Sequence, residues 1–332
     1  MDIVCCLDDN FVMPCGVLLL SVCENNKAED ILFHIITEGL KADNRVKLEA
    51  IAKQYSRKIC FYNIDTSLLK SASESPGLQK PHWTLSVYYR LLLCSVLPEN
   101  IDKVLYLDCD TIVCDSLSEL WSTNLANYAI GAVYDYSGDD IRIYNRLDYD
   151  SSLGYFNAGV LLMNLRYWRT NKIESLLLEY MNSNVAILKY NDQDVLNYVL
   201  REQKKELPMK YNLMKRFFWQ THHLYLNKSR WGDMFNAIQA PVIIHYTPDE
   251  KPWHKDSTFH LDYIWRGYHR LSPWKNEPLT YKASYKQRLK MKLRYILRAV
   301  GLLSPEVSMY RNLDDNCNHL SIDCLTSNTN CH

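Results

Sequence analysis

The residues of this chain best suited to chemistry are two aspartates one residue apart, Asp108 and Asp110. The apolar run Val104–Leu107 leads into them and predicts a buried strand. Because alternate residues of a strand share a face, both carboxylates should point the same way, and two close carboxylates usually need a cation to stay ionised. Oxygen ligands suit Mg²⁺ or Mn²⁺, ions that commonly bind substrate phosphates. The pair therefore predicts a metal-assisted site for a phosphorylated ligand.

A histidine and a lysine far along the chain fit the same chemistry. His245 follows the apolar run Val242–Ile244, and Lys251 follows six residues later. An imidazole that joins two carboxylates on a divalent ion, with an ammonium group nearby, makes a diphosphate site. Mixed oxygen and nitrogen ligands favour Mn²⁺ over Mg²⁺. A lone histidine is more often a hydrogen-bonded core residue, so this assignment depends on its partners.

The segment Val104–Val113 also fits the pattern of haloacid-dehalogenase phosphatases. In that alternative Asp108 is a nucleophile and Asp110 a general acid. Those phosphatases usually carry the motif on their first strand, whereas here the preceding segment already predicts a sheet. The later pair Asp139–Asp140 imitates a second acidic motif of that class, but no apolar strand leads into it.

Short apolar runs alternate with amphipathic segments, which predicts an α/β sheet built from βαβ units. The expected strands are residues 2–7, 31–36, 59–64, 104–107, 128–134, 156–165 and 241–245. The expected helices are residues 12–24, 43–55, 84–97, 173–188 and 194–206, with a surface loop near the site at residues 136–155. Ligands of such sheets bind at the carboxyl ends of strands. The polar residues that follow strand-like runs are Asp8, Asn10, Asp108, Asp110, Asp135 and His245.

The composition is that of an ordinary globular protein, with 332 residues, 47% hydrophobic and 23% charged. Lys plus Arg and Asp plus Glu both number 38, so no basic excess favours a nucleic acid, and we expect no nucleic-acid partner. The 24 tyrosines and 8 tryptophans weakly favour a carbohydrate site.

The cysteines and the start of the chain predict a reducing cytoplasm. Cys5, Cys6, Cys60, Cys94 and Cys109 lie in apolar runs, where cysteine behaves as a small hydrophobic residue. No zinc-type pair of cysteines two residues apart occurs, and we do not expect a disulfide framework. The first residues are acidic and then strand-like, unlike a signal peptide, and no apolar run is long enough to span a bilayer.

The C-terminal region differs from the rest of the chain. Between Tyr281 and Leu303 there are seven Lys or Arg and no acidic residue, interleaved with apolar residues. This pattern predicts a basic amphipathic helix on an anionic membrane surface, at the inner face of the cytoplasmic membrane. We therefore expect a catalytic domain at residues 1–275, a membrane-associating segment at 276–303 and a polar, disordered tail at 304–332, where Cys317, Cys324 and Cys331 stay unexplained.

Eight short motifs follow one another over about residues 1–255: Met1–Val4, Asp8–Asn10, Tyr89–Leu91, Val104–Asp110, Phe156–Leu162, Asp192–Asp194, His245–Tyr246 and Lys251–Trp253. Each motif is modest, but their order and spacing together are specific. The chain resembles glycosyltransferase family 8, the retaining enzymes with a GT-A fold, and within it bacterial lipopolysaccharide and lipooligosaccharide galactosyl- and glucosyltransferases.

The resemblance implies a role for each matching residue. Asp8 and Asn10 would bind uridine, Lys251 would contact phosphate, and Asp108, Asp110 and His245 would ligate Mn²⁺, with Mg²⁺ as the alternative. Arg90, Asp108, Asn157, Asp192 and Gln193 would line the donor sugar, and Asp135 would contact acceptor or donor hydroxyls. Gln193, Asp194 and Asp192 are the candidate catalytic residues, with Gln193 near the anomeric carbon. Retention would proceed by same-face attack of the acceptor or through Asp194 or Gln193.

The implied substrates are UDP-galactose or UDP-glucose and a saccharide or glycolipid acceptor of a cell-surface glycan such as lipopolysaccharide. One departure from the family pattern is Pro248, which stands where the family usually has glycine. Proline has no N–H to offer a phosphate. A non-catalytic UDP-sugar binder is therefore a further alternative.

Overall fold

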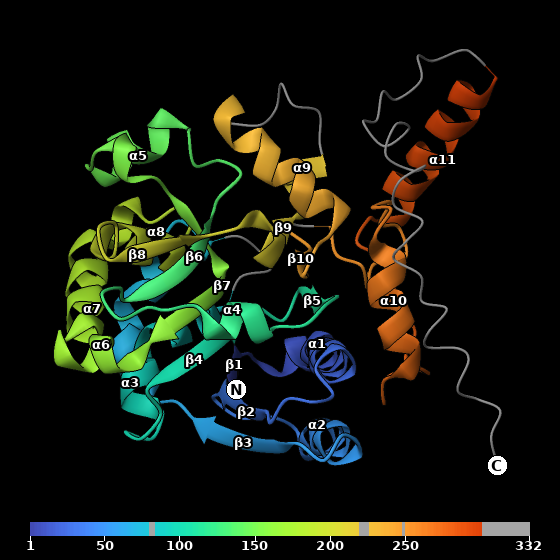
Figure 1. Cartoon of the computed structure of the whole chain (residues 1–332). Coiled ribbons are helices and arrows are strands. Elements are labelled where there is room, and N and C mark those ends of the chain that lie inside the picture. Colours follow the sequence, from blue (N-terminus) through green and yellow to red (C-terminus); the bar gives the residue numbers. More distant parts are fainter. Residues whose placement is uncertain (80–83, 219–225, 248–249, 301–332) are drawn as a thin grey trace. The chain divides into compact units, whose positions relative to one another are not determined.

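The computed structural model describes residues 1–79, 84–218, 226–247 and 250–300 (Figure 1). The chain divides into two compact units. The first comprises Met1–Leu213 and Tyr225–His245, and the second comprises Met214–Leu224 and Tyr246–His332. Pro248 and the tail at 304–332 lie outside the described residues.

The first unit is built on a seven-stranded sheet with the order β3-β2-β1-β4-β7-β6-β8. Its strands are β1 (Asp2–Cys6), β2 (Leu32–Thr37), β3 (Lys58–Asn63), β4 (Lys103–Leu107), β6 (Ile130–Tyr134), β7 (Phe156–Asn164) and β8 (Lys204–Leu207). Neighbouring strands are parallel, except that β7 runs antiparallel to β4 and β6. The predicted α/β fold with a mostly parallel central sheet is confirmed.

Helices flank this sheet (Figure 1). They are α1 (Val12–Asn25), α2 (Ala42–Gln54), α3 (Leu93–Val96), α4 (Ser118–Ser122), α5 (Ile141–Leu147), α6 (Leu165–Thr170), α7 (Ile173–Asn184), α8 (Asp192–Val199) and α9 (Trp231–Gln239). Alternate strand residues such as Val4, Ile36 and Tyr106 join Trp168 and Leu177 in one buried apolar cluster, so the face that these strand residues share packs against α6 and α7.

The order of the strands places the site. The chain builds β1, β2 and β3 outward in one direction and then returns to lay β4 on the other side of β1. The gap between the carboxyl ends of β1 and β4 is thus a topological switch point, where open α/β sheets bind ligands. Asp8 follows β1 and Asp108 follows β4, so both stand at that edge.

A second, three-stranded sheet has the order β5-β10-β9. Its strands are β5 (Thr111–Val113), β10 (Ile243–His245) and β9 (Leu213–Met214). The predicted strand at 241–245 therefore exists, but it pairs antiparallel with β5 instead of extending the main sheet. This pairing places His245 opposite Thr111.

Three predicted segments differ from the structure. The helix expected over 194–206 ends at Val199, because Lys204–Leu207 gains parallel hydrogen bonds to β6 as an edge strand. The loop expected at 136–155 contains α5, whose start is capped by Asp140 accepting a hydrogen bond from the Arg142 N–H. The helix expected at 84–97 is mostly a 3₁₀ helix, Leu85–Leu92, before the short α3.

The second unit contains α10 (Asp262–Leu271) and α11 (Tyr285–Ala299). The indole of Trp265 stacks on His269 with ring centroids 5.2 Å apart. Along α11, Leu289, Leu293 and Ile296 are each more than half exposed. Among the described residues, no helix has the length and apolar character needed to cross a membrane.

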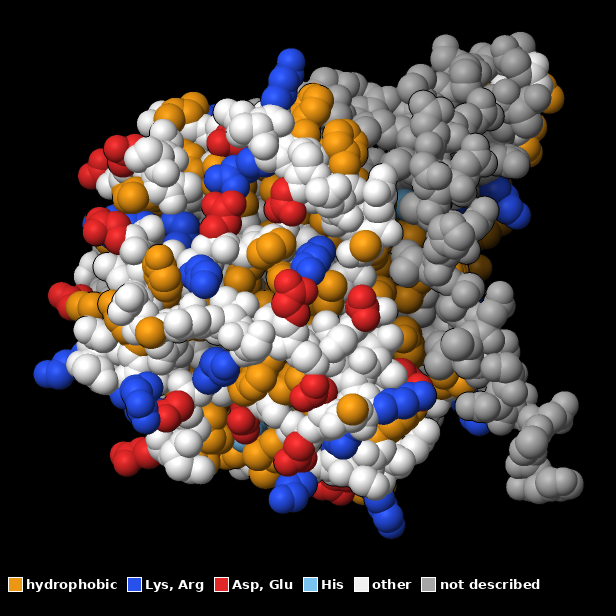
Figure 2. Space-filling model, viewed as in Figure 1, with side chains coloured by type: hydrophobic (Ala, Val, Ile, Leu, Met, Phe, Trp, Pro, Cys, Tyr) orange, Lys and Arg blue, Asp and Glu red, His pale blue; other side chains and the backbone are white. Residues whose placement is uncertain are grey.

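The structure also shows the state of the cysteines and the distribution of surface charge. All eight cysteines of the described ranges are free. Of the five predicted to behave as hydrophobic residues, Cys5, Cys6 and Cys109 are buried, whereas Cys60 and Cys94 are half-buried. On the face shown in Figure 2, acidic and basic side chains are interspersed.

Candidate active site

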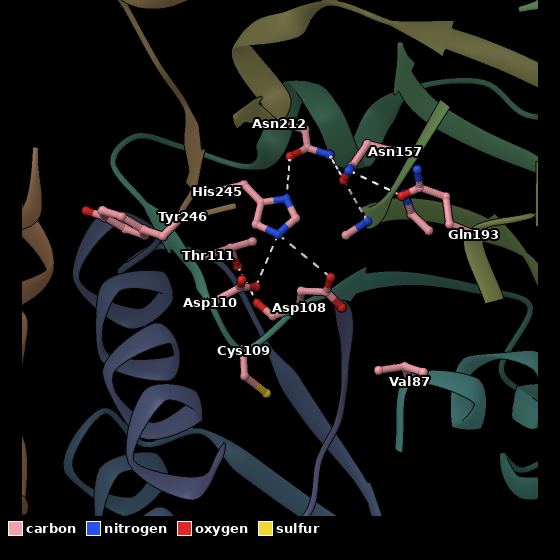
Figure 3. Close-up of polar contacts among 12 residues, drawn as sticks. Val87, Asp108, Cys109, Asp110, Thr111, Asn157, Gln193, Asn212, His245 and Tyr246 are labelled. Carbon is pink, nitrogen blue, oxygen red and sulfur yellow. Dashed lines mark hydrogen bonds and ion pairs between the residues drawn. The ribbon is translucent and has the colours of Figure 1, made fainter. Parts of the chain in front are cut away.

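Asp108, Asp110 and His245 form one cluster in the first unit (Figure 3). One possible ligand atom from each lies within 4.8 Å of the others. His245 Nε2 is 3.1 Å from Asp110 Oδ1 and 3.8 Å from Asp108 Oδ2. Two carboxylates and one imidazole nitrogen suit Mn²⁺ or Mg²⁺. The structure thus brings together the three residues predicted to hold a metal.

The two aspartates share a side for a different reason than predicted. β4 ends at Leu107, and Asp108 and Asp110 stand in a turn rather than in an extended strand. The turn is closed by the Thr111 N–H and hydroxyl, which donate to the Asp108 carbonyl at 3.1 and 2.7 Å. The pairing of β5 with β10 then brings His245 beside the turn.

Asp108 uses its two carboxylate oxygens differently. Oδ1 accepts a hydrogen bond from the Tyr106 hydroxyl at 2.6 Å and lies 2.8 Å from the buried guanidinium of Arg90. Arg90 also lies over the Tyr106 ring and donates to the Ala158 carbonyl at 2.6 Å. Because these donors hold Oδ1, it is Oδ2 that faces His245.

Gly159 makes room for the cluster. A Cβ atom at this position would lie 2.2 Å from His245 Cε1 and 2.9 Å from Asp108 Oδ2, closer than atoms approach without displacement. The backbone of β7 therefore needs glycine here to pass directly beside the proposed metal ligands.

Asp135, Asn157 and Gln193 form a hydrogen-bonded group next to this cluster, in which Asp135 and Asn157 are buried and Gln193 is half-buried. Asp135 Oδ2 accepts from Asn157 Nδ2 at 3.0 Å and from Gln193 Nε2 at 3.3 Å. Asp135 Oδ1 accepts from the N–H and hydroxyl of Ser137. Three side chains predicted to bind sugars thus meet in one place.

The sequence missed Asn212, which joins the two groups (Figure 3). Its Oδ1 lies 3.0 Å from His245 Nδ1, and its Nδ2 donates to Asn157 Oδ1 at 2.9 Å. The side chain is fully buried. The one available signal was a polar residue between Tyr211 and Leu213 in a mostly apolar stretch.

A comparison with known families decides the class. The model of glycosyl transferase family 8 matches residues 2–257. The chain belongs to glycosyltransferase family 8.

Individual relatives agree with this assignment. The lipopolysaccharide 1,2-glucosyltransferase of Escherichia coli is 31% identical over 297 residues, covering 88% of this chain and 84% of that protein. The lipopolysaccharide 1,3-galactosyltransferase of Salmonella typhimurium is 28% identical over 276 residues, covering 81% and 77%. The general stress protein A of Bacillus subtilis is 29% identical over 263 residues, covering 77% and 88%.

The solved structure of the galactosyltransferase LgtC in complex with donor and acceptor sugar analogues superposes with a TM-score of 0.74. The match covers 87% of this chain and all of that chain, at 27% identity. The predicted GT-A fold is confirmed, and the phosphatase interpretation of Asp108 and Asp110 finds no support in these comparisons.

In this glycosyltransferase, Asp192 is a buried carboxylate beside Arg90. Its Oδ2 lies 3.0 Å from Arg90 Nε, but the Nε–H donates to the Val87 carbonyl instead, so the contact with Asp192 is purely ionic. Oδ2 has no hydrogen-bond partner among the described residues. Burial raises the pKa of Asp192 to about 7, Arg90 opposes the rise, and the charge of Asp108 adds to it.

Asp194, one of the candidate catalytic residues, is held by a set of buried hydrogen bonds. Its carboxylate is fully buried and accepts four hydrogen bonds, two from Arg146, one from the Tyr155 hydroxyl and one from the Tyr190 N–H. Both oxygens are therefore occupied, and the group fixes the start of α8 against the α5 segment. The catalytic role of Asp194 stays a prediction.

The remaining predicted residues lie in both units. Asp8 and Asn10 follow β1 in the first unit, where Asp8 Oδ1 accepts from the Asn10 N–H at 2.9 Å. Lys251 belongs to the second unit, where its ammonium group donates to the Tyr246 carbonyl at 3.0 Å. The uridine and phosphate roles of these residues stay predictions, and Pro248 lies outside the described ranges.

Proposed function

We propose that this protein is a retaining hexosyltransferase that moves galactose or glucose from its UDP form to a saccharide or glycolipid acceptor of a cell-surface glycan such as lipopolysaccharide. The metal is Mn²⁺, with Mg²⁺ as the alternative. The observation that carries the proposal is the Asp108–Asp110–His245 cluster at the sheet's switch point, directly beside the hydrogen-bonded group of Asp135, Asn157 and Gln193. The names of the glucosyl- and galactosyltransferase relatives support the choice of hexose and glycan.

Each part of the site has a task in this proposal. Asp8 and Asn10 bind the uridine, and Lys251 binds the diphosphate. A bound metal ion would neutralise the charge that develops on the departing UDP. Arg90 and Asp192, an ion pair with 3.0 Å between Nε and Oδ2, hold the donor sugar.

We assign retention to same-face attack by the acceptor hydroxyl. The ion pair of Asp194 with Arg146 supports this choice over attack by Asp194 as a nucleophile. The Gln193 amide is also engaged, because its oxygen accepts from the Ala158 N–H at 3.1 Å and its nitrogen donates to Asp135. In this assignment Gln193 and Asp192 orient the sugar and stabilise the oxocarbenium-like centre.

The first test is UDP release from a panel of UDP-sugars with Mn²⁺ or Mg²⁺. We expect slow release from UDP-galactose or UDP-glucose without acceptor. If neither sugar nucleotide binds or turns over, the proposal fails, and binding without turnover would instead identify a non-catalytic UDP-sugar binder.

The second test uses matched carboxamide variants. Asp110→Asn should abolish Mn²⁺-dependent UDP binding in a folded protein. Asp102→Asn is the control, because that half-exposed carboxylate precedes β4 and pairs with Arg166 at 2.9 Å. Retained UDP binding in Asp110→Asn would remove the metal role.

We also propose that residues 281–303 bind an anionic membrane surface, which would place the enzyme at the inner face of the cytoplasmic membrane. Exposed apolar side chains along α11, interleaved with lysine and arginine, support this. Deleting residues 281–332 should release the protein from vesicles containing phosphatidylglycerol and spare its activity in solution. Unchanged vesicle binding would contradict the proposal.

A further inference from the structure

Two backbone N–H groups of β7 determine how the neighbouring side-chain amides are oriented. The Ala158 N–H points to Gln193 Oε1 at 3.1 Å, and the Gly159 N–H points to Asn157 Oδ1 at 2.9 Å. A backbone N–H can only donate, so the atom facing it must be the amide oxygen. The amide nitrogens of Gln193 and Asn157 are thereby turned toward Asp135, whose carboxylate can accept from both.

The same constraint passes through Asn212 to the histidine. Because Asn157 presents its oxygen, Asn212 must present its amide nitrogen to it, at 2.9 Å. The Asn212 oxygen then faces His245 Nδ1 at 3.0 Å. An oxygen can only accept, so Nδ1 carries the hydrogen, and Nε2, which faces Asp110 and Asp108, is the nitrogen left to bind a cation.

Asn157, Asn212 and His245 thus form a hydrogen-bonded relay, which is shielded from solvent along its length. Asn212 is 0% exposed, and Asn157 and His245 are 6% and 3% exposed. Competing hydrogen bonds to bulk water are therefore weak, and each amide orientation follows from the one before it.

We propose that Asn212 is a positioning residue that couples the metal half of the active site to the sugar half. Its oxygen selects the His245 tautomer that can bind a divalent cation, and its nitrogen holds the Asn157 amide in the orientation that serves the donor sugar. The inference rests on the proposed function, because it assigns those halves to Mn²⁺ and to the sugar of a UDP-hexose.

Two substitutions separate the two ends of the relay. In Asn212→Asp a carboxylate oxygen still accepts from His245 Nδ1–H, as in the carboxylate–histidine–metal arrangements of metalloenzymes. Its second oxygen opposes Asn157 Oδ1, so the sugar end is lost. In Asn212→Leu, which has a similar volume, both hydrogen bonds are lost.

The experiment titrates the full-length protein with Mn²⁺ in the presence of UDP, following free Mn²⁺ by electron paramagnetic resonance. A calorimetric titration then compares the affinities for UDP and for UDP-galactose or UDP-glucose. For Asn212→Leu we expect Mn²⁺ affinity to fall by about 10- to 100-fold. For Asn212→Asp we expect Mn²⁺ to bind at least as tightly as in the wild type, while the preference for UDP-sugar over UDP falls by about 10-fold or more.

Asn164→Leu is the matched control. The Asn164 amide is also held by hydrogen bonds, to the Tyr167 N–H and the Leu125 carbonyl, but at the far end of β7. Its loss should lower the melting temperature without changing either affinity. A general effect of removing a hydrogen-bonded amide would instead weaken Mn²⁺ binding in this variant as well.

The experiment distinguishes failure of the Asn212 inference from failure of the proposed function. Wild-type Mn²⁺ affinity in Asn212→Leu would overturn it, and so would Mn²⁺ loss or an unchanged sugar preference in Asn212→Asp. If Asn212→Leu does not fold, Asn212→Asp alone decides by the same criteria. Failure of the wild-type protein to bind or turn over any UDP-hexose with either Mn²⁺ or Mg²⁺ would refute the proposed function, whereas normal wild-type binding with unaffected Asn212 variants refutes only the relay.

Discussion

Asp192→Asn should make the protein more stable above neutral pH, even though it changes a residue of the active site. Asp192 is 3% exposed, and burial raises its pKa from 3.8 to about 7. The native state therefore favours the protonated form, whereas the unfolded chain releases this proton near pH 4. Asparagine is neutral throughout this range and avoids the cost of a buried charge.

The magnitude follows from proton linkage. Between about pH 4 and pH 7 the native state binds more protons at Asp192 than the unfolded state does, so stability falls as pH rises. Each pH unit in this window is worth about 1.4 kcal/mol, and from pH 5 to pH 8 the wild type should lose about 3 kcal/mol relative to the variant. Arg90 keeps Asp108 and two carbonyl oxygens in the variant, and its attraction for the ionised Asp192 is already part of the pKa of about 7, because Arg90 opposes the rise.

The assay is urea unfolding of both proteins at pH 5, 6, 7 and 8, with EDTA present to remove metal ions. The quantity to compare is the difference between their free energies of unfolding at each pH. That difference should move in favour of Asp192→Asn as the pH rises and level off above pH 7. A difference that stays constant from pH 5 to pH 8 would refute the conclusion that burial keeps Asp192 protonated.

Two further substitutions test other parts of the site. Gly159→Ala should weaken Mn²⁺ binding by 10-fold or more, because the added Cβ displaces His245. Gly232→Ala in α9 is the control and should leave Mn²⁺ binding unchanged, because its new Cβ meets no neighbouring group within 4 Å. Equal Mn²⁺ titrations for both variants would count against the close approach of β7 to His245. Asp194→Asn should lower the free energy of unfolding by about 3 kcal/mol or more, since it leaves the Arg146 charge buried without its partner, and should keep the turnover of the folded fraction. Normal stability with abolished turnover would support a catalytic role for Asp194.

The residues at strand ends could be predicted because the signal there is local. An apolar run followed by a carboxylate marks Asp8 and Asp108, and parallel strands bring such ends to one edge of a sheet. His245 was found by the same local pattern, although its strand joins the small sheet rather than the large one. The prediction survived this error because β10 still pairs beside the Asp108 turn.

The hydrogen-bond partners of Asp194 and Asn212 could not be predicted, since they lie in segments far apart in the sequence. Asp194 forms an ion pair with Arg146, which lies in a segment that was predicted to be a loop because α5 is short and polar. Asn212 reaches Asn157 across 55 residues, and a single asparagine carries no pattern that reveals its partners. Likewise, β8 forms because β6 offers an edge, which the lysine-rich sequence of 204–207 does not indicate.

The buried charges of the site also link Asp192 to the metal. The carboxylate of Asp108 adds to the raised pKa of Asp192, so a divalent cation bound at Asp108 would cancel part of that repulsion. The pKa of Asp192 should then fall on metal binding, and the native protein should release a proton from this side chain. Repeating the urea series with Mn²⁺ and UDP in place of EDTA should therefore shrink the pH-dependent difference between wild type and Asp192→Asn. If the difference keeps its full size with metal bound, Asp192 is insulated from Asp108, and burial alone sets its protonation.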